Sequence, residues 1–175
     1  RGFNKIEKTQ SKIATKQVNP MTFDEEKRFK EYLMNDTHTY KNLVLIELYT
    51  GMRLGETLAL DISDIDIKSD TIRVSKILTH DENHKPYIHD SALSQTKDGA
   101  RLVQINNIFR NNVIEAMTNA EANEYNKEKL LFCQDNGSLI FESSVNSYLK
   151  KVAKHVDKSP SPCYYITTIK NSQDI

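Results

Sequence analysis

Long apolar runs are absent from this 175-residue sequence. No apolar run is longer than the one from Leu43 to Ile46, whereas a bilayer-spanning helix needs about 20 such residues. The sequence therefore predicts no membrane segment. With 38% hydrophobic residues it has enough apolar material for one ordinary domain with a core. No signal peptide is visible, and because the chain begins Arg-Gly-Phe rather than with Met, we expect it to start inside a longer protein.

Cysteine is scarce, since Cys133 and Cys163 are the only two thiols and neither lies in a C-x-x-C pair. This excludes a disulfide framework and favours reduced thiols of an intracellular protein, with Cys133 as a core residue. The five histidines show no metal-ligand spacing with the cysteines. His80, His84 and His89 share one polar stretch, but without a fourth ligand they are better interpreted as solvated loop residues than as a metal site.

An excess of charge of either sign is also missing, because 24 Lys and Arg balance 24 Asp and Glu. This balance argues against a stand-alone DNA-binding domain, which is usually basic. The charges are unevenly distributed. Acidic residues are concentrated from Asp61 to Asp70, and basic residues are concentrated within residues 1–16. A second basic group lies near the other end: Lys150, Lys151, Lys154 and Lys158. Such patches permit contact with DNA without requiring it, since a charge run is most often a solvated face.

What the sequence does contain is organised around Y-T-G-M-R-L-G-E-T-L-A-L, residues 49–60. An apolar helical run ends at Gly51, which can adopt the left-handed conformation that closes a helix. Arg53 follows, and Glu56, three residues later on a second short helical stretch, can face and orient the guanidinium. An arginine held between two helices and steered by an acid suits a phosphate oxygen. Taken alone, the pattern is equally compatible with a structural role, in which Gly51 only caps a helix and Arg53 and Glu56 only form a surface ion pair.

Alternating apolar and polar residues predict a small antiparallel three-stranded sheet. Segments 61–67 and 71–77 flank a polar turn and predict a β-hairpin. The turn at 96–99, which carries Lys97, leads into a third strand at 100–105. Between them, residues 80–94 are polar and contain Pro86, so we expect a long connection there. A further short strand is expected at 130–132.

Helical signals dominate the rest of the chain, so the predicted fold class is α+β and mainly helical. Thr22 and Glu25 form a capping box at the start of a helix that continues to about Asn35. A helix at 39–50 is apolar nearly all round and should be central. Two more helices are expected, one at 106–127 and one that Ser143 caps, with Val145, Leu149, Val152 and Val156 on its core face. Residues 1–20 are interpreted as a basic linker or arm and 159–175 as an irregular tail.

The order T-G-M-R-L-G-E, then D-I-x-D-I-D, then a hairpin, then T-K-D-G-A-R-L-V-Q-I resembles the catalytic domain of the tyrosine recombinases, the phage-integrase family. The resemblance covers roughly Thr22 to Asp157. It implies a site-specific DNA recombinase that cleaves and rejoins strands through a 3′-phosphotyrosyl intermediate. The implied partner is a double-stranded DNA attachment site, with self-assembly on DNA in the full-length protein. The implied location is the cytoplasm, and neither a metal nor a cofactor is needed.

The resemblance also assigns site residues. It implies that Arg53 clamps the scissile phosphate and that Glu56 orients Arg53 or supports the fold. Lys97 matches the lysine that protonates the departing 5′ oxygen, which requires a pKa lowered toward neutrality. The alternative for Lys97 is an ordinary exposed turn lysine.

Two family motifs are not found, so residues 21–158 are interpreted as a partial, C-terminally incomplete catalytic domain. No histidine is followed three residues later by Arg, and the nearest approximation, His155 to Lys158, offers a lysine that cannot replace a bidentate fork. Tyr164 and Tyr165 are not assigned as the nucleophile, because in the family that tyrosine lies well downstream of H-x-x-R. We therefore expect the chain by itself to be inactive, through truncation or a changed reading frame.

Three alternatives remain open from the sequence. The chain could be a non-catalytic DNA-binding or regulatory remnant of an integrase. It could be a relative of the type IB topoisomerases, which share the fold and the chemistry. It could also be an unrelated helical domain, in which case Arg53 and Lys97 would lie far apart.

Overall fold

The computed structural model describes residues 21–90 and 100–156. Within these ranges the elements follow one another as α1 (Phe23–Asn35), α2 (Lys41–Thr50), α3 (Leu54–Leu58), the 3-10 helix η1 (Ile62–Asp64), β1 (Ile65–Asp66), β2 (Thr71–Val74), β3 (Lys76–His80), β4 (Pro86–Asp90), β5 (Arg101–Gln104), α4 (Arg110–Ala122) and α5 (Glu142–Lys154). The prediction of a mainly helical α+β fold is confirmed. The predictions for the two ends of the chain and for Lys97 lie outside the described residues.

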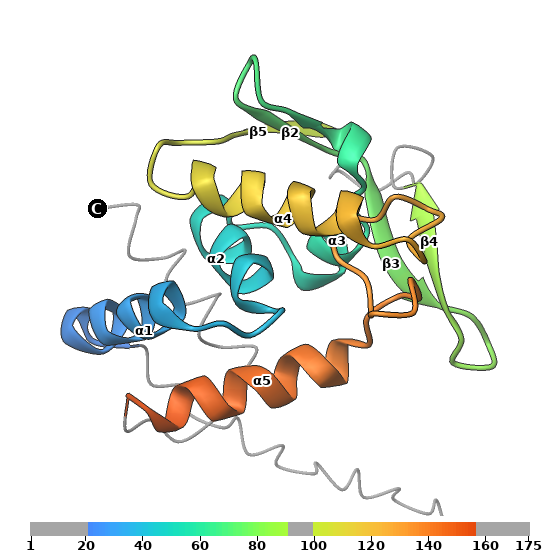
Figure 1. Cartoon of the computed structure of the whole chain (residues 1–175). Coiled ribbons are helices and arrows are strands. Elements are labelled where there is room, and N and C mark those ends of the chain that lie inside the picture. The colour runs from blue at the N-terminus through green and yellow to red at the C-terminus, as the bar shows by residue number, and fades with distance from the viewer. Residues whose placement is uncertain (1–20, 91–99, 157–175) are drawn as a thin grey trace, which may run out of the picture.

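Helix α2 forms the centre of the molecule. It contacts α1, α3 and α4, and in Figure 1 it lies between the sheet on one side and the pair α1 and α5 on the other. Its residues Leu43–Ile46 are completely buried, as the all-round apolar pattern predicts. Gly51 ends the helix with φ 67° and ψ 15°, and its amide donates to the carbonyl of Glu47. The left-handed glycine cap expected from the sequence is therefore confirmed.

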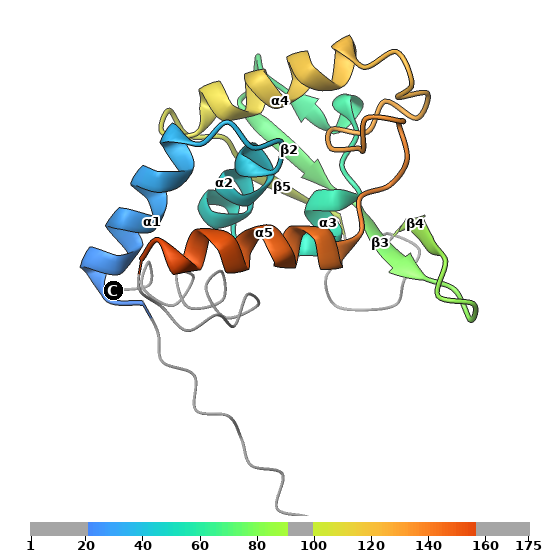
Figure 2. The ribbon, with the colours of Figure 1, turned by 60° about the horizontal axis from the view of Figure 1, so that its bottom comes forward.

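The capping box at the start of α1 is also confirmed. The Thr22 hydroxyl accepts a hydrogen bond from the Glu25 amide, and the Glu25 carboxylate accepts one from the Thr22 amide. Phe29 and Leu33 are the buried residues of this helix and pack into the common core. In Figure 2, α1 and α5 meet at one end, which agrees with their contacts.

The three-stranded sheet has the order β1-β2-β5, with both pairs antiparallel. Its hairpin is shorter than predicted, because residues 62–64 form η1 instead of strand. The prediction of one strand at 71–77 is also wrong, because this segment divides into β2 and β3, which belong to different sheets. The Asp61 side chain accepts from the Ser63 amide, and the Asp64 side chain accepts from the Asp61 amide. These two carboxylates satisfy local amides within a turn, so the alternating pattern there does not continue the strand. Residues 130–132 contribute a single bridge, between Leu130 and Asp61.

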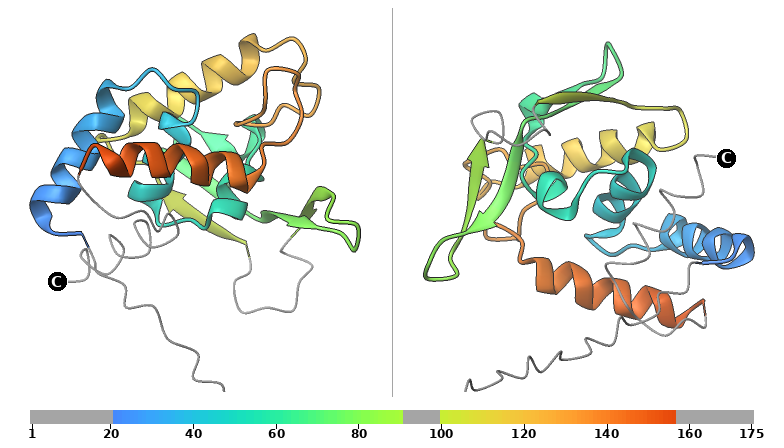
Figure 3. Two further views of the ribbon diagram at one scale, coloured as in Figure 1. Left: turned by 90° about the horizontal axis from the view of Figure 1, so that it is seen from below. Right: turned by 180° about the vertical axis from the view of Figure 1, so that it is seen from behind.

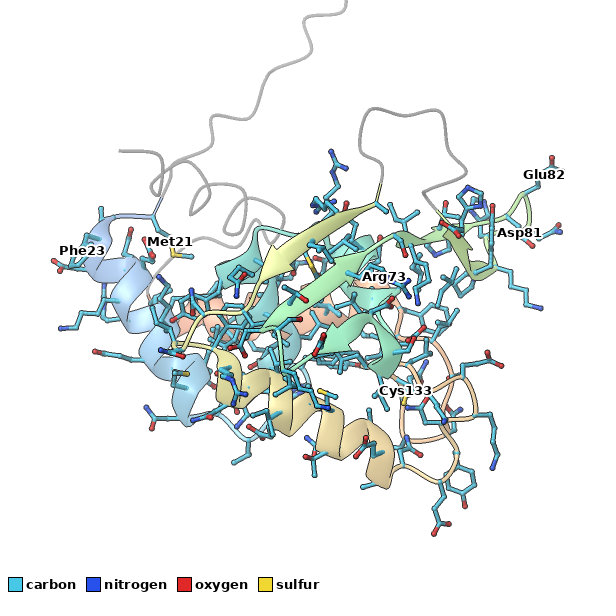
Figure 4. All side chains as sticks on the ribbon, turned by 90° about the horizontal axis from the view of Figure 1, so that it is seen from above. Met21, Phe23, Arg73, Asp81, Glu82 and Cys133 are labelled. Atoms are coloured by element: carbon cyan, nitrogen blue, oxygen red, sulfur yellow. The ribbon has the colours of Figure 1, made fainter. Side chains whose placement is uncertain are left out.

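The prediction of a long connection at residues 80–94 is wrong for residues 86–90, which form β4, while residues 91–94 lie outside the described ranges. This strand pairs with β3 from Lys76↔Asp90 to His80↔Pro86. The turn between them is closed by the Asp81 carboxylate, which accepts from two following amides, and by His84 at φ 60°. Side-chain hydrogen bonds from Asp81 thus close a hairpin whose residue Leu78 is buried in the core. The hairpin extends away from the body of the molecule in both views of Figure 3, and Figure 4 labels Asp81 at its tip.

The last two helices differ from their predicted limits. Helix α4 is shorter than the predicted 106–127, since Asn106 accepts from the Ile108 amide before it and Asn123 accepts from the Tyr125 amide after it. Helix α5 begins at Glu142, so Ser143 lies inside the helix and the prediction that it is the cap is wrong. The predicted core face of α5 is confirmed for Val145, Leu149 and Val152, which are buried. Val156 is also buried but lies beyond the end of the helix at Lys154. Within the described ranges, no helix combines the length and apolar character that crossing a bilayer requires.

Candidate functional site

Arg53 stands at the junction of two helices. The chain leaves α2 through the left-handed Gly51, buries Met52 completely, and enters α3 with Arg53 as the extended N-cap residue. The Arg53 amide donates to Oε2 of Glu56 over 2.8 Å. Buried neighbours before and after it therefore fix the backbone of Arg53, while 62% of its side chain is exposed.

A second glycine sets the position of α3 against the strands. A Cβ atom on Gly55 would lie 3.0 Å from the carbonyl oxygen of Leu78 and 3.2 Å from Cγ1 of Ile77, both on β3. Such distances are tighter than ordinary contacts, so a side chain at this position would push α3 away from β3. Gly55 thus allows the close packing that holds the first turn of α3, and with it Arg53 and Glu56, in place.

Glu56 joins two arginines that are far apart in the sequence. Its side chain is only 7% exposed, and Arg101 at the start of β5 donates to both carboxylate oxygens, over 3.0 Å from Nη1 and 2.7 Å from Nη2. Nη1 of Arg53 lies 3.7 Å from Oε1 of the same carboxylate, beyond hydrogen-bonding distance but within the range of an ion pair. We refer to Arg53, Glu56 and Arg101 as the Arg–Glu–Arg cluster.

The Arg–Glu–Arg cluster is charged at neutral pH. Burial alone would raise the pKa of Glu56, but the hydrogen bonds from Arg101 and from the Arg53 amide, together with both guanidinium charges, hold that pKa below its usual value. One carboxylate against two guanidinium groups leaves a net charge of one positive unit in the cluster. An anion that approaches the exposed guanidinium groups would therefore be attracted.

A neighbouring ionic group is neutralised instead. The Asp64 carboxylate, whose side chain is completely buried, lies 2.6 Å from Nζ of Lys76 and 3.2 Å from Nη2 of Arg73. Lys76 also pairs with Asp61. Burial by itself would lower the pKa of Lys76, but its two acidic partners raise it. These ion pairs link β2, where Figure 4 labels Arg73, and β3 to η1.

The predicted site residues meet different outcomes. Arg53 and Glu56 lie side by side as expected, whereas Lys97 lies outside the described residues, so its distance from Arg53 stays untested. Sequence reasoning missed Arg101, although it stands in the same stretch as Lys97 and begins the predicted third strand. The sequence gives little indication that Arg101 belongs to the site, because Arg101 reaches α3 through the pairing of β5 with Val74 of β2.

Residues 17–167 match the profile of the phage integrase family. Among curated proteins, the integrase of Staphylococcus phage L54a is 23% identical over 164 residues, which cover 87% of this chain and 45% of that protein. Among solved structures, the Tn1549 transposon integrase in complex with transposon right end DNA is similar, with a TM-score of 0.71, 20% identity, and coverage of 91% of this chain and 53% of that one. The XerA recombinase gives a TM-score of 0.66 and 21% identity, with coverage of 90% and 51%.

The two solved structures share the fold of this chain. The chain spans about half the length of the relatives and structures to which it is similar. The profile covers the whole described part of the chain, including the Arg–Glu–Arg cluster.

Proposed function

Because the chain belongs to the phage integrase family, we propose that it forms part of the catalytic domain of a site-specific DNA recombinase. The proposed partner is a double-stranded DNA attachment site, on which the full-length protein would self-assemble. The proposed location is the cytoplasm. We assign residues 21–158 to the catalytic domain, with residues 1–20 as the arm that precedes it.

The observation that carries this proposal is the geometry of Arg53. Its backbone is fixed at the start of α3, its guanidinium is largely exposed, and a buried carboxylate lies beside it. A planar guanidinium with a fixed backbone can bind two phosphate oxygens at once, and its charge stabilises the negative charge of a five-coordinate phosphate. Arg53 is therefore the proposed clamp on the scissile phosphate, and Glu56 its support.

The proposed reaction is exchange of one phosphodiester bond for another. In the full-length protein, the hydroxyl of a tyrosine that is not identified in this chain gives up its proton to water and attacks the phosphorus, a 3′-phosphotyrosyl bond forms, and the bond to the 5′ oxygen breaks. Lys97 is the proposed general acid that gives its proton to that departing oxygen. In the rejoining step a 5′ hydroxyl attacks the phosphotyrosyl bond and releases the tyrosine. Each step replaces one phosphodiester bond by another, so strands can be exchanged without an external energy source.

Salt-dependent DNA binding by the 175-residue chain tests the role of Arg53. Fluorescence anisotropy with a short labelled duplex would give the affinity over a series of salt concentrations. We expect Arg53→Gln to weaken binding and to reduce the slope of log K against log salt by about one, as for a lost phosphate contact. Arg53→Lys should restore part of the affinity but not all of it, since lysine keeps the charge without the fork.

The matched control is Arg110→Gln. Arg110 is also a partly exposed arginine in an ion pair, with Asp70, so that its removal changes the net charge of the chain by the same amount. Binding by the Arg110 variant should stay near that of the wild type. Equal losses for the two variants, or no measurable binding by the wild-type chain, would contradict the proposed phosphate clamp.

A further inference from the structure

We propose that Arg101 is a positioning residue for Arg53, acting through the carboxylate that the two arginines share. The inference rests on the proposed function, since Arg53 is taken to be the phosphate clamp. Arg101 neutralises Glu56, and Glu56 can then hold Arg53 in place without cancelling its positive charge.

The distances show which arginine Glu56 binds more tightly. Arg101 donates one hydrogen bond to each carboxylate oxygen, of 3.0 and 2.7 Å, which is the parallel two-bond geometry of a strong guanidinium–carboxylate pair. The guanidinium of Arg53 lies at 3.7 Å from the same carboxylate. Glu56 therefore contacts the Arg53 side chain through its charge, while its hydrogen bonds go to Arg101 and to the Arg53 amide.

All three residues are placed by rigid elements. Arg101 pairs with Val74 at the start of β5, and the next pair, Leu102 with Arg73, keeps β5 in register with β2. Glu56 is fixed by the close contact of α3 with β3 at Gly55. The sheet and the helix thus bring Arg101 and Glu56 together independently of any ligand, as a preorganised site requires.

Removing Arg101 would change the electrostatics of the cluster. A buried carboxylate must be paired, and among the described residues the cation beside it would then be Arg53. The Arg53 guanidinium would then move from 3.7 Å into direct hydrogen bonds with Glu56. The summed charge of the cluster residues would fall from one positive unit to zero. A phosphate would meet a neutral, self-satisfied ion pair in place of a cation.

The first test observes Arg53 without DNA. In a ¹⁵N–¹H spectrum of the arginine side chains of the DNA-free chain, we expect Arg101→Gln to shift the Nε–Hε signal of Arg53. Adding Glu56→Gln to Arg101→Gln should return the signal toward its wild-type position, because an amide no longer attracts the guanidinium. Arg110→Gln is the control and should leave the Arg53 signal unchanged. An Arg53 signal that does not respond to Arg101→Gln would overturn the proposal whether or not the chain binds DNA.

The second test measures binding to the same labelled duplex. Arg101→Gln should weaken binding at low salt about tenfold, which corresponds to the loss of one charge-assisted contact. The double variant Arg101→Gln with Glu56→Gln should regain most of this affinity, although it has lost the same arginine. Gln at position 56 still accepts from the Arg53 amide, so the start of α3 is kept. Arg101→Lys, which keeps the charge but not the fork, should lie between wild type and Arg101→Gln.

The outcomes separate the possible roles. If Arg101→Gln weakens binding and Glu56→Gln does not restore it, Arg101 either supports the fold or contacts DNA itself, and the positioning role is wrong. If Arg101→Gln binds as tightly as the wild type, the positioning role is also wrong, while the clamp role of Arg53 can still hold. If the Arg53 signal responds as expected but the wild-type chain binds no DNA, the positioning is correct and the proposed function fails. Thermal unfolding of each variant checks that it is folded.

Discussion

Replacing Glu56 by alanine should destabilise the chain more than its position on a five-residue helix suggests. The change removes the acceptor of the Arg53 amide at the start of α3 and both acceptors of the Arg101 guanidinium. It also leaves two guanidinium groups close together without the carboxylate between them. Both can turn toward water, since Arg101 is 40% and Arg53 62% exposed, so the cost of a buried unpaired charge is avoided.

The expected loss of unfolding free energy in Glu56→Ala has two parts. Loss of the helix-capping interaction costs about 1 kcal/mol. A guanidinium–carboxylate pair that is half in solvent lies between the surface and buried limits, so we take about 1 to 2 kcal/mol for the pair with Arg101. The free energy of unfolding should therefore fall by about 2 to 3 kcal/mol, and the melting temperature by about 5 to 10 °C for a chain of this size. Glu56→Gln keeps the cap and should cost about half as much.

Urea unfolding followed by circular dichroism would measure these differences. Glu115→Ala is the matched control, because the Glu115 side chain is 44% exposed in its pair with Lys41 and its loss should cost under about 1 kcal/mol. The pH dependence gives a second check. The pKa of Glu56 is lower in the folded state than its unfolded value near 4.3, so its contribution is complete above that pH and is lost as the pH falls through the folded pKa. The difference between wild type and Glu56→Gln should shrink on acidification. A loss of unfolding free energy in Glu56→Ala that is no larger than the loss in Glu115→Ala would refute the described contacts of Glu56.

Two further substitutions test the surroundings of the site. Asp64→Asn should lower the free energy of unfolding by about 2 kcal/mol in urea unfolding, because the buried carboxylate loses its charge against Lys76; a change under about 0.5 kcal/mol would contradict the structural role of this group. Gly51→Ala forces a side chain into the left-handed conformation at φ 67° and should cost about 1 kcal/mol or more. Gly51→Asn should cost less in the same assay, since Asn tolerates this conformation, and equal stability of the two variants would argue against the cap.

Features encoded within a few residues could be predicted from the sequence. The capping box at Thr22, the buried helix around Leu45 and the glycine cap at Gly51 each depend on neighbours within four positions, and all three are confirmed. The pair of Arg53 with Glu56 belongs to the same class, because three residues separate them along one helix start. In these cases the local chemistry has few competing solutions.

Features that depend on distant residues, or on competing local bonds, could not be predicted. Strand β4 was missed because Asp81 closes its turn with side-chain hydrogen bonds that no apolar pattern signals. Ser143 looked like a cap by residue type, but the helix begins one residue earlier, at Glu142. Arg101 lies 45 residues from Glu56, and its contact exists only because β5 pairs with β2. Nothing within a few residues of Arg101 in the sequence points to Glu56.

The balanced composition is a poor guide to DNA binding for the same reason. Charges act over about 8 Å at physiological salt, so the pairing within one cluster matters more than the sum of 24 basic and 24 acidic residues. Lys76 lies among acids that use up its charge, and it offers nothing to a phosphate. Glu56 is shared by two arginines, so these three residues together carry one positive unit. An electroneutral chain can therefore present a cationic site, provided that the buried carboxylate has a second arginine to neutralise it.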